Sequence, residues 1–504
     1  MKLSLVALII ASYFVWSAPA GAQSAAPGEL GTVNFATSAK GPAQSAFLVG
    51  VKALHNFEFD TAAEAFREAQ KSDPGFALAY WGEAMSYNHP LWAEQDIASA
   101  RRVLERLAPT AAARAAKAPA GRERGLVEAV DVLFGAGDKY ARDVAYSAAM
   151  KRLHEQYAGD DEISTLYALS LLGTARPGEK SVRTAMQAAA IAEDIFQRNP
   201  KHPGAAHFII HAFDDPDHAI LALPAARAYS KIAPAAAHAL HMPSHIFAQL
   251  GMWDDVVASN VVAYKAAVDL AEKKNLPRGR EDFHTLSWLQ YAYLQQGHVA
   301  DAEKALATAK AVADTDASPR VRDGYAAMKA RQIVETAKWE KIALPAAAVR
   351  DGGAPGYDGS AAYVLAAGLG AAKLGDLETA TIAMDRLKAM RTQAESGSNA
   401  YRARPFAIME KEVAAALAIA KKDAAGAEQL LKEATAIEAA LDAPSGPPEP
   451  IKPSFELYGE LLVEQGRLKD AAAQFEQALA RMPNRRASMQ GIEKTRAGRP
   501  SDAR

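Results

Sequence analysis

Histidine is concentrated in one short stretch of the chain, and its spacing there suits metal binding. Seven of the twelve histidines lie within residues 202–245. Two pairs among them share the pattern His-x-x-x-His, namely His207 with His211 and His241 with His245. Residues four apart on a helix lie on one face, one turn apart, so each pair can present two imidazoles to a single ion. The pattern predicts a histidine-ligated metal site.

The separation of the two pairs along the chain supports this prediction. Each histidine of the second pair follows its counterpart in the first by 34 residues, which is the length of a common helix-turn-helix repeat. The two pairs then hold the same positions of neighbouring repeats. Because packed helices lie about 8–10 Å apart and metal–imidazole bonds are about 2.0–2.1 Å long, four imidazoles can converge on one point.

The repeat is clearest at residues 454–483. In such a repeat a small residue in the first helix lets the second helix approach, glycine ends the first helix and proline ends the second. The matching residues are Phe455, Gly459, Leu462, Gly466, Leu468, Ala471, Phe475, Ala478 and Pro483. This pattern resembles the tetratricopeptide-repeat (TPR) superfamily, and the chain as a whole is similar to exported bacterial TPR-repeat proteins of a histidine-rich subgroup. The resemblance implies an all-α fold, a TPR-like α-solenoid in which antiparallel helix pairs form a right-handed superhelix.

The resemblance also implies where ligands bind. In TPR domains the fifth and ninth positions of the first helix of each repeat face the concave groove, and the two histidine pairs hold these positions. His284 is expected as a fifth metal ligand or as a residue that supports the ligands. For Trp81 and Trp288, packing in the core is the alternative to a groove contact. The side chains expected to contact the groove are Trp81, His89, Asp214, Asp215, His238, Glu281 and Trp288.

The lack of cysteine restricts the metal. Without thiolates the ligands must be nitrogen and oxygen, which suits copper, zinc or non-haem iron, and we rank copper ahead of zinc. Four histidines closed around zinc would form a structural site. An ion held by three histidines and a water would form a hydrolytic site, with Asp214, Asp215 or Glu281 as the general base. Two ions, each held by one pair and one further histidine, would resemble the all-histidine dicopper centres of oxidases.

These site predictions lead to two candidate functions. One is a metal-dependent protein, an oxidoreductase or a hydrolase. The alternative is a metal-free scaffold that binds a peptide, a protein or a small-molecule ligand in its concave groove. Nucleic acid is not an expected partner, because 57 Lys and Arg residues are balanced by 59 Asp and Glu residues. The sequence also lacks a nucleophile elbow, a phosphate-binding glycine loop and a dinucleotide fingerprint.

The start of the chain predicts export. Residues 1–22 begin with Lys2, continue with an apolar run and end with the small residues Ala20-Gly21-Ala22, as a secretory signal does. The protein is therefore expected in the periplasm or outside the cell, with no stable membrane anchor after signal cleavage.

The remaining boundaries follow from composition. Residues 23–42 are predicted to be a flexible leader, residues 43–490 the solenoid, and residues 491–504 a disordered tail. The segment Asp442–Pro453 contains five prolines, which cannot continue a helix. It either links the last repeat to the array or folds across the groove.

Overall fold

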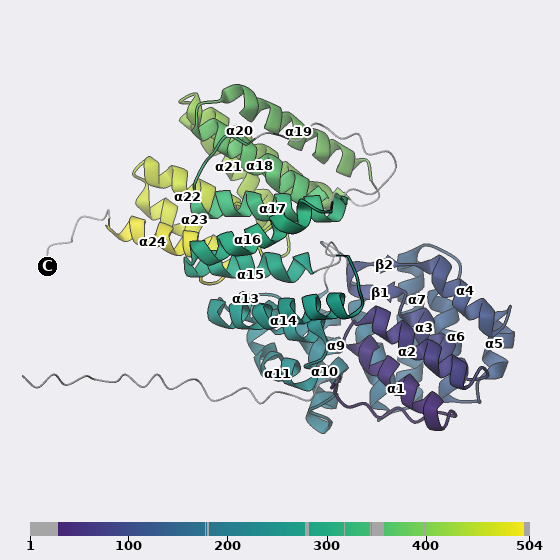
Figure 1. Cartoon of the computed structure of the whole chain (residues 1–504). Helices are drawn as coiled ribbons and strands as arrows, with labels where there is room; N and C mark the ends of the chain where they lie inside the picture. Colours follow the sequence, from purple (N-terminus) through teal and green to yellow (C-terminus); the bar gives the residue numbers. More distant parts are fainter. Residues whose placement is uncertain are drawn as a thin grey trace, which may run out of the picture.

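The computed structural model describes residues 29–176, 178, 181–277, 282–316, 318–342, 344, 357–397 and 400–497 (Figure 1). The signal predicted at residues 1–22 lies outside these ranges. Within them the chain is almost entirely helical, and the only strands are the short β1 and β2. None of the described helices combines the length and hydropathy needed to cross a lipid bilayer.

The elements follow one another along the chain as a series of helices. The first part contains α1 (Gly41–His55), α2 (Phe59–Ser72), α3 (Ala77–Met85), β1 (Asn88–His89), the 3-10 turn η1 (Pro90–Trp92), β2 (Glu94–Gln95), α4 (Ile97–Leu107), α5 (Ala111–Lys117), α6 (Arg122–Leu133), α7 (Lys139–Gln156), α8 (Asp161–Leu172) and α9 (Val182–Arg198). The middle contains α10 (Pro203–Ala212), α11 (Ala219–Ile232), α12 (Ala237–His241), α13 (Pro243–Gln249), α14 (Trp253–Lys273), α15 (Phe283–Gln296), α16 (Val299–Ala313) and α17 (Pro319–Thr336). The last part contains α18 (Tyr357–Lys373), α19 (Leu377–Glu395), the 3-10 turn η3 (Ala400–Ala403), α20 (Arg404–Ala420), α21 (Ala424–Ala439), α22 (Ser454–Glu464), α23 (Leu468–Arg481) and α24 (Arg486–Ala497).

The helices are stacked in chain order. Most of them pack chiefly against the next helix, and several also contact the one after it. Figure 1 shows the same progression, from the purple helices at one side through teal to the yellow helices. Contacts between neighbours along the chain are the defining property of a solenoid. The predicted all-α, TPR-like solenoid is therefore confirmed.

Glycines in the first helix of a pair allow this close stacking. A Cβ atom at Gly459 would lie 2.7 Å from the ring of Phe475 in the paired helix, and one at Gly50 would lie 2.7 Å from the ring of Phe66. Real Cβ atoms do not approach so closely, because core side chains are already packed at crystal-like density. The small residues of the repeat pattern therefore match a contact that a larger residue would break.

The described part of the predicted leader is packed against the solenoid. Residues 29–40 run along α1, α8 and the start of α10 without forming a helix. The Thr32 amide donates to the Lys201 carbonyl at 2.9 Å, and the Asn34 amide donates to the Glu162 carboxylate at 3.1 Å. The prediction of a flexible leader is corrected for these residues, because their backbone groups have partners that the composition does not reveal.

Aromatic residues extend this packing into the core. Phe35 is buried, and its ring centroid lies 5.2 Å from Phe47 and 6.3 Å from Trp81. Trp81 is only 1% exposed and belongs to this cluster. Its prediction as a groove contact is wrong, and the core alternative holds, because the segment before α1 covers the face that would otherwise be open.

The C-terminal end packs back onto the middle of the array. Helix α24 contacts α15 (Figure 1) and continues to Ala497, so residues 491–497 are helical and not part of a disordered tail. Arg485, just before α24, is 1% exposed and forms ion pairs with Glu335 and Glu456, both at 2.7 Å. It also donates to the hydroxyl of Tyr291 at 3.0 Å. One buried guanidinium thus joins four elements.

We expect Arg485→Ala to lower the free energy of unfolding by about 3–5 kcal/mol, because it leaves two buried carboxylates without their cation. Urea denaturation followed by circular dichroism measures this change. The matched control is Arg467→Ala, whose side chain is 41% exposed and pairs with Glu428 at 2.9 Å, and it should lower the free energy of unfolding far less, because exposed ion pairs contribute little. Equal losses in the two variants would contradict the role given to Arg485.

Candidate metal centre

Six histidines form two clusters in the middle of the solenoid. In each cluster one ring nitrogen from every histidine lies within 4.8 Å of the others. The sequence predicted four histidines around one point, with one pair and one further histidine at each of two points as an alternative, and the structure groups the rings in the second way. Triad A consists of His207, His211 and His238, and triad B of His241, His245 and His284. His238, expected only as a groove contact, and His284, expected as a fifth ligand, are the third members.

Triad A is built from α10 and α12. The Nε2 atom of His207 lies 3.0 Å from Nε2 of His211 and 3.1 Å from Nε2 of His238. On its other side His207 donates from Nδ1–H to the carbonyl oxygen of His55 at 2.7 Å. A carbonyl can only accept a hydrogen bond, so this contact assigns the ring proton to Nδ1 and leaves a lone pair on Nε2. That lone pair points into the triad.

Triad B spans three helices, because the second pair does not lie on a single helix as predicted. Pro243, which lacks an amide hydrogen, separates α12 from α13. The break leaves the pair together, since Nε2 of His241 lies 3.2 Å from Nε2 of His245. His284, from the start of α15, places its Nε2 atom 3.0 Å from that of His241. His284 is also the most exposed of the six rings.

Acceptors orient two rings of triad B. His241 donates from Nδ1–H to the side-chain oxygen of Asn260 on α14 at 2.6 Å. The amide group of Asn260 itself donates to the Val256 carbonyl at 2.8 Å, which fixes its oxygen toward the histidine. His245 donates from Nδ1–H to the Asp214 carboxylate at 2.8 Å. Partners of this kind fix the orientation of histidine rings at metal sites and raise their basicity.

These contacts make the triads electrostatically unusual. His241 and His245 both use Nδ1 as the donor, so in their neutral forms two Nε2 lone pairs face each other at 3.2 Å. Burial lowers the pKa of His207 to about 3 and lowers the pKa of His241 well below its usual value, so these two rings are neutral. Facing lone pairs repel each other, and a cation between them would relieve the repulsion.

The nitrogen spacing is close to that of a metal site. Two nitrogens bound at about 2.0–2.1 Å to a tetrahedral ion lie about 3.3 Å apart. Two Nε2 separations in each of triads A and B lie between 3.0 and 3.2 Å. The two triads also adjoin, since the ring centroids of His211 and His245 are 6.3 Å apart. Two neighbouring three-nitrogen sites are thus available to metal ions.

A short turn after α1 supports triad A. Phe57 has a φ of 57°, and its ring centroid lies 4.4 Å from His207 and 5.5 Å from His238. The carboxylate of Glu58 accepts a hydrogen bond from the His238 backbone amide at 3.3 Å, at the start of α12. Helix starts leave such amides without partners inside the helix. The turn therefore packs against His207 and His238 of triad A and also holds the start of α12, the helix that carries His238.

The proline-rich segment covers triad B. Trp288 on α15 is 4% exposed, and its ring centroid lies 4.4 Å from that of His245. A Cβ atom at Gly446 would lie 2.2 Å from the Trp288 indole, so the backbone of the segment rests on this ring. We call residues 442–453 the strap. Of the two predicted arrangements for this segment, the structure shows the one that folds across the groove.

The strap is also connected to His245 of triad B by a chain of hydrogen bonds. The side-chain amide of Gln249 donates to the Pro444 carbonyl at 2.9 Å and to the Asp214 carboxylate at 3.2 Å. Asp214 in turn accepts from His245. Asp214, predicted as a groove contact or a catalytic base, is therefore a partner that orients a histidine.

The other predicted contact residues have different positions. Asp215 accepts a hydrogen bond at 2.7 Å from His218, a histidine that belongs to neither triad. Glu281 lies outside the described residues. His89 stacks on Phe59 with ring centroids 4.1 Å apart, close to triad A. The contact of α1 with α10 brings this early part of the chain next to the histidine-rich helices.

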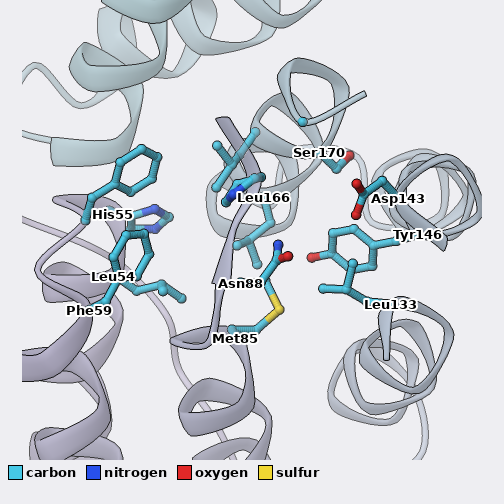
Figure 2. Close-up of a pocket in the computed structure, with 14 residues that line it drawn as sticks. Leu54, His55, Phe59, Met85, Asn88, Leu133, Asp143, Tyr146, Leu166 and Ser170 are labelled. Atoms are coloured by element: carbon cyan, nitrogen blue, oxygen red, sulfur yellow. The ribbon is translucent and has the colours of Figure 1, made fainter. Parts of the chain in front are cut away.

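A small apolar cavity lies behind the Phe57 turn (Figure 2). Figure 2 shows His55 and Phe59 on one side of it and Tyr146 and Leu133 on the other. Its volume is about 20 Å³, which is room for about one water molecule.

A third cluster combines two histidines with a carboxylate. His55 and His202 flank the buried Glu162, with nitrogen–oxygen distances of 2.9 and 3.3 Å. The carboxylate accepts a hydrogen bond from Nε2 of His55, whereas Nε2 of His202 makes none. Glu162 is absent from the residues predicted above, because nothing in its local pattern signals a buried acid. This cluster joins α1, α8 and the start of α10.

Comparisons with known proteins found similar chains only among solved structures. A comparison with protein-family models found no match, and neither did a comparison with curated proteins. Among solved structures, yeast Tom70 is 12% identical with a TM-score of 0.34, covering 90% of this chain and 95% of that chain. A Rap protein complexed with competence and sporulation factor is 15% identical with a TM-score of 0.35, covering 79% and 99%. A human IFIT1 dimer with m7Gppp-AAAA is 12% identical with a TM-score of 0.33, covering 92% and 91%.

We expect Gly446→Ala to lift the strap from Trp288, because the new methyl group would overlap the indole ring. The free energy of unfolding should fall by about 1–3 kcal/mol, and the tryptophan fluorescence should shift to longer wavelength. The control is Gly75→Ala, where a Cβ atom would approach only the Asp73 carboxylate, at 3.4 Å. An unchanged spectrum in Gly446→Ala would mean that the strap does not rest on Trp288 in solution.

Proposed function

We propose that this chain binds two transition-metal ions, one at each histidine triad, and that the ions form a paired centre for oxidation–reduction chemistry. The observation that carries the proposal is the convergence of Nε2 atoms at 3.0–3.2 Å in two adjoining triads. Hydrogen bonds from Nδ1 of His207, His241 and His245 to fixed acceptors support the same conclusion.

The ligand chemistry favours copper. Each proposed ligand set consists of three imidazole nitrogens, without thiolate or carboxylate ligands. Imidazole suits copper, zinc, iron and nickel, and among divalent ions copper binds such sites most tightly. Three protein ligands leave a coordination position for an exogenous molecule, as catalytic metal sites require. We therefore rank copper ahead of zinc.

The position of the carboxylates argues for redox chemistry over hydrolysis. A hydrolytic site needs a general base within reach of a metal-bound water. Asp214 accepts from His245 and Gln249, and Asp215 accepts from His218. Both are engaged in holding other groups. Two neighbouring copper ions, in contrast, can each take up one electron, so that a bound reductant loses two.

A second candidate function is the binding of a peptide or protein partner in the groove. The observation that favours it is the strap itself, because an extended segment of this chain already lies in the groove against Trp288 and Gln249. A synthetic peptide with the sequence of residues 442–453 that binds the metal-free protein would support this candidate.

We expect the purified protein, loaded with copper and freed of loosely bound ions, to hold two ions per chain. His207→Ala should remove the ion of triad A, and His241→Ala the ion of triad B, so that each variant holds one. Elemental analysis by mass spectrometry measures these numbers. The control is His154→Ala, since His154 contacts Ser164 at 2.9 Å outside both triads. A wild-type chain without bound metal would disprove the proposal.

We expect Asp214→Asn to weaken copper binding at triad B by about 10–100-fold, because His245 loses the carboxylate that orients it. Binding at triad A should be unchanged. Competition with a chromophoric chelator measures both affinities. Asp215→Asn is the matched control at the next position, since Asp215 contacts His218 and neither triad. If the two variants bound copper equally well, Asp214 would have no part in the site.

A further inference from the structure

An aromatic surface adjoins triad A on its solvent side. It consists of Phe57, Phe59, His89 and Trp92, which we call the aromatic platform. Phe57 and Phe59 are stacked at 5.2 Å, and His89 is stacked on Phe59 at 4.1 Å. Trp92 meets Phe57 edge-on at 5.6 Å and the triad ligand His238 at 6.2 Å. The platform therefore extends from a proposed metal ligand to the surface.

Trp92 is unusual among these residues because it is exposed. The exposed fraction of its side chain is 48%, although neighbouring tryptophans such as Trp81 and Trp288 are almost fully buried. A large aromatic side chain that remains exposed beside a cluster of polar ligands is typical of a binding surface. The face that Trp92 presents to solvent is open to a ligand.

The backbone around the platform is held in rarely adopted conformations. Phe57 has a φ of 57° and Ala93, next to Trp92, a φ of 53°. Such conformations are unfavourable for residues other than glycine, and they concentrate at ligand-binding sites. The Phe57 turn holds the Phe57 ring against triad A, and the Ala93 turn orients Trp92. The two strained residues therefore determine where the platform lies.

The hairpin that carries His89 and Trp92 is anchored to the solenoid. Strands β1 and β2 pair His89 with Glu94 and Asn88 with Gln95. The guanidinium of Arg142 on α7, which is 8% exposed, donates to the side-chain oxygen of Gln95 at 2.6 Å. A rigid support of this kind keeps the platform at a fixed distance from the metal ligands.

We infer that triad A, with the aromatic platform, binds a planar aromatic molecule that carries a hydroxyl group. The ring stacks on Trp92 and meets His89 edge-on, since these two rings are almost perpendicular, and the oxygen takes the open coordination position of the ion as a phenolate, with its proton passing to solvent. This inference rests on the proposed function, because the oxygen needs a metal ion. The cavity of about 20 Å³ behind Phe57 is too small for such a ring, so the outer face is the one that binds.

The test uses the copper-loaded full-length protein and 4-nitrophenol as the probe, with its visible absorption reporting binding. Cyclohexanol has a hydroxyl group but no planar ring, and it serves as the matched competitor. The variant is Trp92→Leu, which keeps an apolar side chain and removes the ring. The control is Trp339→Leu, since Trp339 packs near Lys373 in the last part of the chain, with the ammonium 5.7 Å from its ring.

We expect Trp92→Leu to retain two copper ions and to bind 4-nitrophenol about 5–10-fold more weakly, which is the size of a lost aromatic contact. Trp92→Phe should recover most of the affinity, Trp339→Leu should match the wild type, and cyclohexanol should not compete. If Trp92→Leu fails to fold, the same comparison is made with His89→Leu.

Three results would overturn the inference, and they differ in whether they also reject the metal centre. Unchanged 4-nitrophenol affinity in Trp92→Leu with two bound ions would reject the aromatic ligand and leave the metal centre intact. Binding of 4-nitrophenol to metal-free protein with equal affinity would reject the coordination of its oxygen. A chain that binds no metal would remove the proposed function and this inference together.

Discussion

The two triads depend on acceptors that bind the outer nitrogen of each oriented imidazole. The His55 carbonyl, the Asn260 side chain and the Asp214 carboxylate each take an Nδ1–H hydrogen bond. Each of these contacts leaves a lone pair on Nε2. The lone pair of His207 points into triad A, and those of His241 and His245 face each other in triad B. Water cannot separate them as it would at the surface, because His207 and His241 are buried. A cation is the natural partner for such an arrangement.

These acceptors are available only because the solenoid folds back on itself. His55 lies at the end of α1 and is 152 residues from His207 in sequence, yet its carbonyl contacts that ring. The segment over residues 29–40 fastens α1 to the start of α10, through contacts such as that of Thr32 with Lys201. On the other side the strap reaches Gln249 from 195 residues away. The candidate centre is therefore a product of closure, and a single repeat could not form it.

Local periodicity explains which parts of this arrangement the sequence predicts. The repeat pattern gives the helix pairs, and the spacing of 34 residues places His207, His211, His241 and His245 in one region. The pattern cannot tell that Pro243 divides the second pair between two helices, nor that His238 and His284 complete separate triads. Those outcomes depend on the angle between neighbouring repeats, which small changes in packing determine. The Nδ1 acceptors were also missed, since a backbone carbonyl and an asparagine have no recognisable signature.

The third cluster differs from the triads in the partner of its histidines. At Glu162 a buried carboxylate lies 2.9 Å from His55 and 3.3 Å from His202 and supplies a negative charge. In the triads only imidazole nitrogens meet, and in triad B two Nε2 lone pairs face each other. Histidine thus meets a carboxylate in one place and other imidazoles in another.

The most direct test of this account is the X-ray absorption spectrum of the copper-loaded protein at the copper edge. The account predicts about three imidazole nitrogens around each ion at about 2.0 Å, with the multiple-scattering features of imidazole rings. A first coordination shell made of oxygen, without imidazole scattering, would contradict it, because the converging Nε2 atoms would then not be what holds the metal.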